Sequence, residues 1–220
     1  MITLIDPTAG KGSVPIYVLK IVLSETKPSV WRRLQVPGNA NLGWLHATIQ
    51  VAMGWTNSHL HQFRIGDVVC SDPKFQLDED ADAVPVLDEN KTILMAVAPR
   101  TGASLSYQYD FGDSWEHQIV VEKVLAPDPA AVESSLCLAG ARACPPEDCG
   151  GGWGYANLLK VIKNPKHEEH ESMLEWIGGE FDAETFDLET ANACLRKLKW
   201  PRMTESQLRK VLMARDNYHE

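Results

Sequence analysis

The 220-residue sequence contains no apolar run that approaches the roughly 20 residues needed by a membrane-spanning helix. Residues 1–13 also lack the basic and apolar segments that mark a secretory signal peptide. These two absences predict a soluble protein that stays in the cytoplasm and has no membrane partner.

Basic residues are in deficit, because 21 Lys and Arg stand against 30 Asp and Glu, for a net charge of −9. Broad binding to nucleic acid relies on basic contacts to phosphates. The charge balance therefore argues against a general nucleic-acid-binding role, but it does not exclude a local basic patch. The partner we expect is a protein or a small molecule whose identity the sequence does not give.

Cysteine is scarce and poorly spaced for a zinc knuckle. Among the five cysteines, Cys137, Cys144 and Cys149 have C-x6-C and C-x4-C spacings, which differ from paired CxxC motifs. These thiols could hold structural zinc together with a histidine. The alternative is buried or incidental thiols, since a cytoplasmic protein normally keeps its cysteines reduced. A Walker phosphate-binding loop is also absent, because no GK[ST] follows the glycines at 150–152.

The strongest pattern that is present predicts a β-hairpin over residues 105–124. Apolar and aromatic residues alternate with polar residues on both sides of a turn, as half-buried strands require. An odd-length turn keeps the apolar sides of both strands together. We therefore expect a three-residue loop at 112–114, which pairs Tyr109 with His117 and points Asp110 away from His117.

Other segments show either strand or helix patterns. Alternation predicts strands at 16–23 and 30–36 and a short strand in the sequence SHLHQF. Asn41 is a good N-cap and Gly54 a good stop for a helix between them. Acidic residues predict a solvated loop at 71–90, and Pro and Gly predict irregular structure at 127–152. Helical patterns cover residues 153–162, 168–177, 187–198 and a segment starting at 204.

This order of elements predicts an α+β fold, because strands dominate the first half and helices the second. We expect an antiparallel or mixed sheet in the first half, packed by helices, and a mainly helical C-terminal half. No linker-like stretch divides the chain. We therefore predict a flexible lead-in at residues 1–15 and a single domain at residues 16–220.

Histidines and aspartates near the hairpin form a candidate metal site. Two histidines at alternate positions of a strand point to the same face, and carboxylates at a hairpin tip could complete a site for a divalent metal such as zinc. The alternative assigns the histidines to packing and the aspartate at 113 to the turn. The candidate ligands are His59, His61, Asp110, Asp113 and His117.

The sequence CPPEDCGGG is a second candidate. Its prolines restrict the backbone at one end, and its glycines allow a sharp reversal at the other. We expect this loop to form the wall of a pocket and to pack against the hairpin at residues 115–117. Its glycines could also form an anion-binding nest, which the neighbouring acids oppose. The candidate pocket residues are Trp115, Glu147, Asp148, Trp153 and Tyr155, and the alternative places the aromatic ones in the core.

Several strings resemble the plasmid pRiA4b ORF-3-like family, whose members also occur as passenger proteins of insertion elements. They span roughly residues 16–198 and include YVLKIVLSETKPSVWRRLQVP, LGWLHATIQVAMGW, SHLHQF, YQYDFGDSWEHQIVVE, CPPEDCGGGWGY and GGEFDAETFDLE. The resemblance implies an α+β fold of unsettled function. Some members carry a resolvase-like label, yet no serine or tyrosine recombinase constellation is present in this sequence.

Two functions are compatible with these observations. The first is a non-catalytic binding or interaction module in a mobile-element or host process. The alternative is a metal-dependent hydrolase or nuclease, in which the His/Asp cluster holds a metal that activates water. We favour the first, because no nucleophile, base and orienting residue can be assembled from the sequence.

Overall fold

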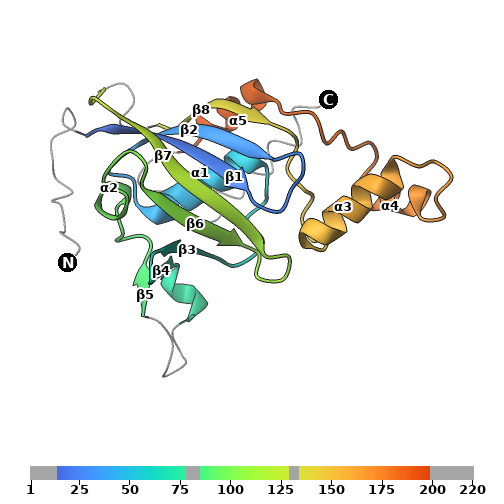
Figure 1. The fold of residues 1–220 in the computed structure, drawn as a ribbon, viewed down its shortest axis with the longest axis horizontal. Coiled ribbons are helices and arrows are strands. Elements are labelled where there is room, and N and C mark those ends of the chain that lie inside the picture. Colours follow the sequence, from blue (N-terminus) through green and yellow to red (C-terminus); the bar gives the residue numbers. More distant parts are fainter. Residues whose placement is uncertain (1–13, 78–84, 129–133, 199–220) are drawn as a thin grey trace.

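The computed structural model describes residues 14–77, 85–128 and 134–198. Its strands form one eight-stranded sheet with the order β5-β4-β3-β6-β7-β1-β2-β8 (Figure 1). The elements are β1 (Ile16–Leu23), β2 (Trp31–Pro37), α1 (Leu42–Met53), β3 (His61–Ile65), β4 (Val68–Ser71), the 3-10 helix η1 (Pro73–Phe75), β5 (Val86–Asp88), α2 (Leu94–Val97), β6 (Ser104–Tyr109), β7 (Trp115–Leu125), β8 (Leu136–Ala141), α3 (Gly151–Ile162), α4 (His170–Trp176) and α5 (Leu188–Leu195).

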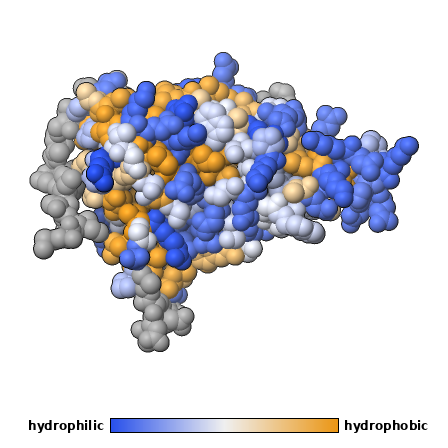
Figure 2. Space-filling model, in the orientation of Figure 1, coloured by the Kyte–Doolittle hydropathy of each residue, from blue (hydrophilic) through white to orange (hydrophobic). Residues whose placement is uncertain are grey.

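The sheet has one packed face and one solvent-facing face. Among the described strands, every pair is antiparallel apart from β4 and β5. Figure 2 shows hydrophilic and hydrophobic residues mixed over the surface of the molecule. α1 lies across the packed face (Figure 1), and polar residues such as Arg33 and Glu122 occupy the other face. Such a division is common in antiparallel sheets. The period-two pattern of the sequence therefore separates these two faces, and the α+β class is confirmed.

α1 forms where the sequence predicts it. The Asn41 side chain accepts a hydrogen bond from the Trp44 backbone N–H at 2.8 Å, and Gly54 ends the helix with a left-handed φ of 102°. Eleven of its twelve residues are buried. A helix that is buried on almost every side belongs in a core rather than on a surface. α1 therefore fixes the depth of the packed layer on the sheet.

The central hairpin has an odd-length turn, but its register differs from the predicted one. Tyr109 lies opposite Trp115, and Tyr107 lies opposite His117. The predicted pairing of Tyr109 with His117 is therefore wrong by two residues. The turn is longer than three residues, because residues 110–114 leave the ladder. The odd length still places the apolar sides of β6 and β7 on one face.

Three strands lie where the sequence predicts no regular sheet structure. β5 and η1 fall inside the stretch 71–90 that was predicted to be a solvated loop, β4 precedes it, and β8 falls inside the stretch 127–152. β8 has no β-branched residue and β5 has only three residues, so neither carries a strong local signal. Because β7 and β8 belong to the second half of the chain, a mainly helical C-terminal half is not supported.

α5 lies along the outer edge of the sheet at β8. The Asn192 side-chain Oδ1 accepts a hydrogen bond from the Cys137 backbone N–H at 2.8 Å, and its Nδ2 donates to the Cys137 carbonyl at 2.9 Å. β2 pairs with the opposite side of β8. One amide of α5 thus takes the place that a neighbouring strand would have. Asp187 begins this helix as predicted by accepting a hydrogen bond from the Thr190 N–H.

α3 and α4 pack together as an arm that projects from the sheet (Figure 1). The arm presents a mainly hydrophilic surface in Figure 2. None of the helices within the described ranges has the length and apolar character needed to cross a membrane. The predicted helix from residue 204 and residues 1–13 of the lead-in predicted at 1–15 lie outside those ranges. The division into a lead-in and one domain therefore stays a prediction.

Candidate functional site

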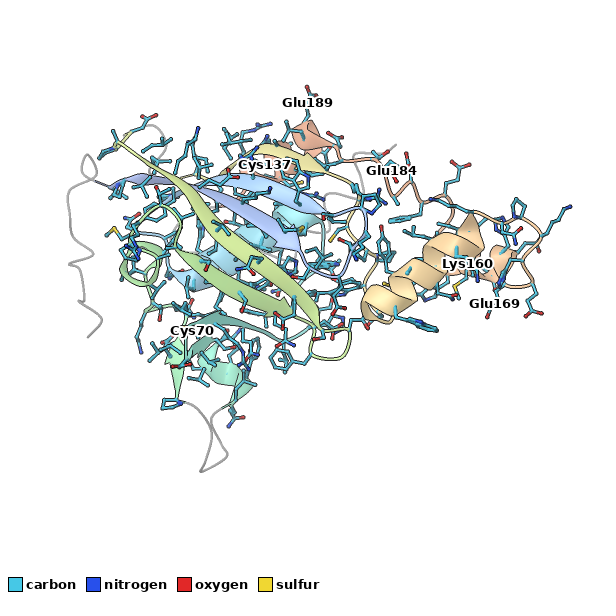
Figure 3. The ribbon with its side chains drawn as sticks, in the orientation of Figure 1. Cys70, Cys137, Lys160, Glu169, Glu184 and Glu189 are labelled. Carbon is cyan, nitrogen blue, oxygen red and sulfur yellow. The ribbon has the colours of Figure 1, made fainter. Side chains whose placement is uncertain are left out.

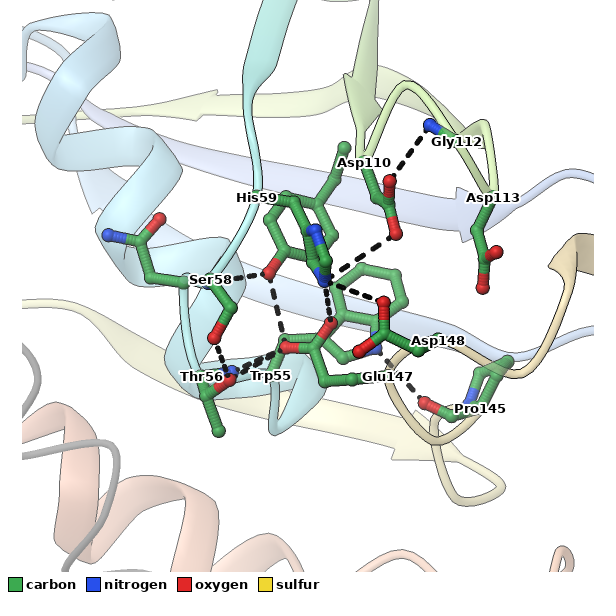
Figure 4. A network of polar contacts seen from close by, with 12 residues as sticks. Trp55, Thr56, Ser58, His59, Asp110, Gly112, Asp113, Pro145, Glu147 and Asp148 are labelled. Atoms are coloured by element: carbon green, nitrogen blue, oxygen red, sulfur yellow. Dashed lines mark hydrogen bonds and ion pairs between the residues drawn. The ribbon is translucent and has the colours of Figure 1, made fainter.

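Three loops meet beside the end of the central hairpin. They are residues 54–60 between α1 and β3, the hairpin turn at 110–114, and residues 142–150 between β8 and α3. Figure 4 shows that their polar side chains point toward one another. Segments far apart in the sequence therefore build one polar cluster, which we call the His59 cluster: His59, Asp110, Glu147 and Asp148.

A buried polar network from α1 holds the first loop. His46 donates from Nε2 to the Asn57 side-chain oxygen at 2.8 Å, and Gln50 Oε1 accepts from the Asn57 backbone N–H at 3.0 Å. Asn57 has a φ of 57°, a left-handed conformation that Asn tolerates better than most residues. The Ser58 N–H donates to the Tyr109 hydroxyl at 3.0 Å. The backbone around His59 is thus fixed from both the helix and the hairpin.

The hairpin turn directs Asp110 inward. Asp110 has a φ of 57°, and its backbone N–H donates to the Leu60 carbonyl at 2.9 Å. Its Oδ1 accepts the Gly112 N–H at 2.9 Å, which is a local side-chain turn. The other carboxylate oxygen, Oδ2, is left facing His59. Local backbone chemistry therefore orients this side chain before any ligand is considered.

The CPPEDCGGG loop docks on the other two loops. The Trp55 indole N–H donates to the Pro145 carbonyl at 3.0 Å, and the Gly150 N–H donates to the Asp113 carboxylate at 3.1 Å. Glu147 Oε1 accepts hydrogen bonds from the Thr56 N–H at 2.8 Å, the Thr56 hydroxyl at 3.0 Å and the Tyr109 hydroxyl at 3.1 Å. The loop contacts the hairpin at Tyr109 and at Asp113 in the turn. The expected contact with residues 115–117 stays a prediction.

His59 Nε2 is surrounded by carboxylates but forms no hydrogen bond to any of them. It lies 3.2 Å from Asp148 Oδ1, 3.6 Å from Asp110 Oδ2 and 3.8 Å from Glu147 Oε2. Both this nitrogen and Glu147 Oε2 are buried without a hydrogen-bond partner. Asp110 is almost fully buried, with 8% of its side chain exposed, whereas Asp148 is 71% exposed. The cluster is therefore closed on one side and open to solvent on the other.

The spacing of these atoms is compatible with a metal-ligand set. Ligands held about 2.0–2.2 Å from a tetrahedral zinc ion lie about 3.4 Å from one another. His59, Asp110 and Asp148 offer ligand atoms that all lie within 4.8 Å of one another, and no other such group of three or more His, Cys, Asp or Glu occurs among the described residues. The arrangement could hold one divalent cation and leave positions for water.

The structure leaves His61 outside this cluster. His61 is buried, its ring stacks on His46 with the centroids 3.4 Å apart, and its Nε2 lies 2.8 Å from Glu89 Oε2. Burial lowers the pKa of His61 to about 3 and raises that of Glu89 to about 7. The strand begins at His61, so His59 precedes it in a bend. The predicted period-two relation between the two histidines therefore does not apply.

His117 and Asp113 also have other roles. His117 donates from Nδ1 to the carbonyls of Tyr107 at 3.1 Å and Trp115 at 3.0 Å, and burial lowers its pKa to about 4. His61 and His117 lie on the same packed face, with the Tyr107 ring between them at 6.0 and 5.2 Å. Asp113 binds the Gly150 N–H. Of the five predicted ligands, the structure brings together His59 and Asp110.

The predicted pocket residues separate into three groups. Glu147 and Asp148 join the His59 cluster, which the local sequence around His59 did not indicate. Trp115 is fully buried near Trp55, and Tyr155 is buried against Phe181, so these two are core residues. Trp153 is instead 83% exposed on α3.

The cysteines do not assemble a metal site in the described residues. Cys137 is buried on β8, and Figure 3 shows it far along the sheet from Cys70. Neither Cys144 nor Cys149 belongs to the metal-ligand group. Burial, with nearby Asp113, raises the pKa of Cys149 to about 12, so its thiol keeps its proton near neutral pH. The alternative of incidental or buried thiols fits these positions.

Sequence reasoning missed Glu89 and His46. Glu89 lies in a stretch that its acidic neighbours mark as solvated, yet it is only 3% exposed. His46 lies on a helix whose apolar neighbours suggested plain packing, yet its Nδ1 accepts a 2.8 Å hydrogen bond from the Tyr107 hydroxyl. The contact between His46 and Tyr107 forms because α1, β3 and β6 come together in the fold. No local signal in the sequence could have predicted this contact.

Known proteins resemble this chain over most of its length. The model of the plasmid pRiA4b ORF-3-like protein family matches residues 15–190. An uncharacterised protein, y4hQ of Sinorhizobium fredii, is 40% identical over 189 residues, which cover 84% of this chain and 93% of that protein. A protein of unknown function from Methanosarcina mazei, MM3350, has a crystal structure with a TM-score of 0.70 and 36% identity, and the match covers 82% of this chain and 98% of that one. The chain belongs to the plasmid pRiA4b ORF-3-like family.

Proposed function

We propose that the protein is a binding module whose His59 cluster holds a divalent metal ion. The observation that carries this proposal is the environment of His59 Nε2, which three carboxylates approach at 3.2–3.8 Å without a hydrogen bond. A protonated imidazole would instead donate a charge-assisted bond of about 2.7–2.9 Å to one of them. A cation bound by His59, Asp110 and Asp148 would satisfy the nitrogen and these two carboxylates together, with Glu147 beside it.

The donor set indicates which metals would fit. One imidazole nitrogen with carboxylate oxygens suits borderline and hard cations, such as Zn²⁺ or Mn²⁺. A structural zinc site is normally closed by four protein ligands. The exposure of Asp148 supports an open site, in which the metal would also contact solvent or an external ligand. We therefore propose that the metal forms part of the ligand-binding surface.

Hydrolysis is a second candidate, and the state of Glu147 favours it. Three donors hold its Oε1, while Oε2 is buried, has no hydrogen-bond partner and faces the cluster. A carboxylate fixed beside a metal site could accept a proton from a metal-bound water. This second proposal requires the first, because the water needs a cation to activate it.

Metal titration tests the first proposal. We expect protein purified without added metal to bind Mn²⁺ or Zn²⁺ at one site per chain in calorimetry, and Asp110→Asn or Asp148→Asn to weaken binding by at least about tenfold. Asp113→Asn is the matched control, since Asp113 carries the same charge nearby but binds the Gly150 N–H instead. Equal losses in all three variants would show that general charge attraction, rather than coordination, binds the metal.

The two candidates separate through Glu147. With p-nitrophenyl phosphate esters as probes, Glu147→Gln should keep metal affinity within about threefold and lose hydrolysis if this carboxylate is the base. Wild-type protein that binds metal and hydrolyses none of these esters would argue for the binding module. We also propose a cytoplasmic location, which the five free cysteines support, because cytosolic thiols stay reduced.

A further inference from the structure

A groove beside the His59 cluster has two tryptophans in its walls. It has a volume of about 500 Å³ and is formed mainly by the start of α3, by α4 and by the end of the CPPEDCGGG loop. We call it the tryptophan groove, and its principal side chains are Asp148, Cys149, Trp153, Leu158, Met173 and Trp176. Asp148 belongs to both the groove and the His59 cluster, so the two sites are continuous.

Both tryptophans are unusually open to solvent. Trp153 is 83% exposed and Trp176 is 50% exposed, which are the two largest values among the exposed large apolar side chains of the described residues. Leaving such large rings in water forgoes a substantial hydrophobic gain. The arm that carries them projects from the sheet (Figure 1), so a macromolecule could reach both rings. Exposed aromatic groups of this kind mark binding surfaces.

The charges around the groove are negative. Among the residues that the structure describes, no Lys or Arg lines it, and Asp148 is the only charged lining residue. Asp110, Asp113 and Glu147 stand next to Asp148, and a divalent cation would neutralise only half of these four carboxylates. Further along the arm, Glu169 and Lys160 are both exposed (Figure 3), so the excess of negative charge lies at the Asp148 end of the groove. A phosphate or another anion would meet repulsion here, whereas a cation would be attracted whether or not metal is bound.

We propose that the tryptophan groove binds an arginine-bearing segment of a partner protein. A guanidinium is planar and weakly hydrated, so it stacks on an indole face while its N–H groups reach a carboxylate. Trp153 and Trp176 supply the indole faces, and Asp148 supplies the carboxylate at the mouth of the groove. The chain contains the same type of contact internally, where the Arg32 guanidinium lies 3.8 Å from the Phe186 ring centroid. The inference does not rest on the metal proposal.

Fluorescence anisotropy with a labelled hexa-arginine peptide and the full chain tests this inference. We expect binding at about 20 mM salt that persists at about 150 mM salt, because stacking is screened less than charge attraction. Trp153→Ala and Trp176→Ala should each weaken it by about tenfold. Trp31→Phe is the control, since Trp31 lies on β2 and already contacts Lys20 and Arg33. Trp153→Phe should restore part of the affinity.

Three outcomes would overturn the inference. Equal hexa-arginine binding by the wild-type chain and both alanine variants would show that the net charge of the protein, and not the groove, attracts the peptide. Free arginine bound as tightly as hexa-arginine would identify a small-molecule site instead of a protein-docking groove. Tighter binding of hexa-glutamate or of AMP would assign the groove to anions. Each titration is run with and without Mn²⁺, so a failure of the metal proposal is seen separately as an absence of metal binding.

Discussion

The contact between α3 and the hairpin turn gives a sharp prediction for Gly151→Ala. Gly151 has a φ of +66°, and a Cβ built there would lie 2.6 Å from the Asp113 carbonyl oxygen. Two penalties therefore add. The left-handed backbone costs about 1 kcal/mol for a residue with a Cβ, and the steric clash adds about 1–3 kcal/mol, because the opposing atom belongs to the backbone and cannot rotate away.

Gly66→Ala separates the two penalties. Gly66 has a φ of +57°, and a Cβ there would meet nothing within 4 Å. It therefore measures the backbone penalty alone, which we expect to be about 1 kcal/mol. Urea unfolding, monitored by tryptophan fluorescence, gives the free energy of unfolding of both variants. Gly151→Ala should lose at least about 1 kcal/mol more than Gly66→Ala.

The same variant reports on the His59 cluster. If the clash pushes the hairpin turn away from α3, Asp110 moves with the turn, so metal affinity should fall in Gly151→Ala and stay unchanged in Gly66→Ala. Equal destabilisation by the two alanines would refute the reasoning, because it would mean that the loop and the turn separate freely. Unchanged metal affinity in a strongly destabilised Gly151→Ala would show that the turn absorbs the clash without moving its carboxylates.

Two further predictions concern buried ionisable groups. Arg32→Lys should lower the free energy of unfolding by about 3 kcal/mol, because Arg32 donates to four backbone carbonyls that a lysine cannot all reach. Arg33→Lys, on the solvent-facing side, should cost less than about 1 kcal/mol. Equal losses in matched urea titrations would contradict this prediction. For His117, the folded pKa of about 4 lies below the ordinary 6.5, so the unfolded chain takes up the proton first and stability falls as pH drops from 6.5 to 4, by up to about 3 kcal/mol. His117→Gln should reduce the slope of the stability profile between pH 6.5 and 4 without abolishing it, because the lowered pKa of His61 contributes a slope of the same sign. An unaltered slope would place the acid sensitivity elsewhere.

The elements that carry their own local signals could be predicted. Asn41 and Gly54 mark the ends of α1 because capping chemistry is local. Strand β1 has the predicted bounds because its sequence IYVLKIVL is rich in β-branched and other apolar residues. β8 could not be predicted, since its sequence LCLAGA is strand only through its pairing with β2. Propensity alone does not encode such a tertiary contact.

The candidate site also has features that local sequence predicts and features that depend on tertiary contacts. Asp110 was predicted as a ligand but was expected to lie on a regular strand, and its positive φ, which no strand pattern reveals, turns it toward His59. Glu147 and Asp148 were predicted as pocket residues because of their place in a constrained loop. The approach of Glu147 to His59 depends on hydrogen bonds from Thr56 and Tyr109, which are distant in sequence. Residue types were therefore predictable, and their convergence was not.

The amide of Asn192 has a consequence for the behaviour of the protein in concentrated solution. A free strand edge is a template for edge-to-edge association, which leads to aggregation. β8 is a terminal strand of the sheet, and the amide occupies the outward N–H and C=O of Cys137. An incoming strand from another copy would first have to displace α5 from this position. Resistance to association at this edge thus depends on α5, whose Asn192 occupies the backbone groups of Cys137, in addition to the repulsion between negatively charged molecules.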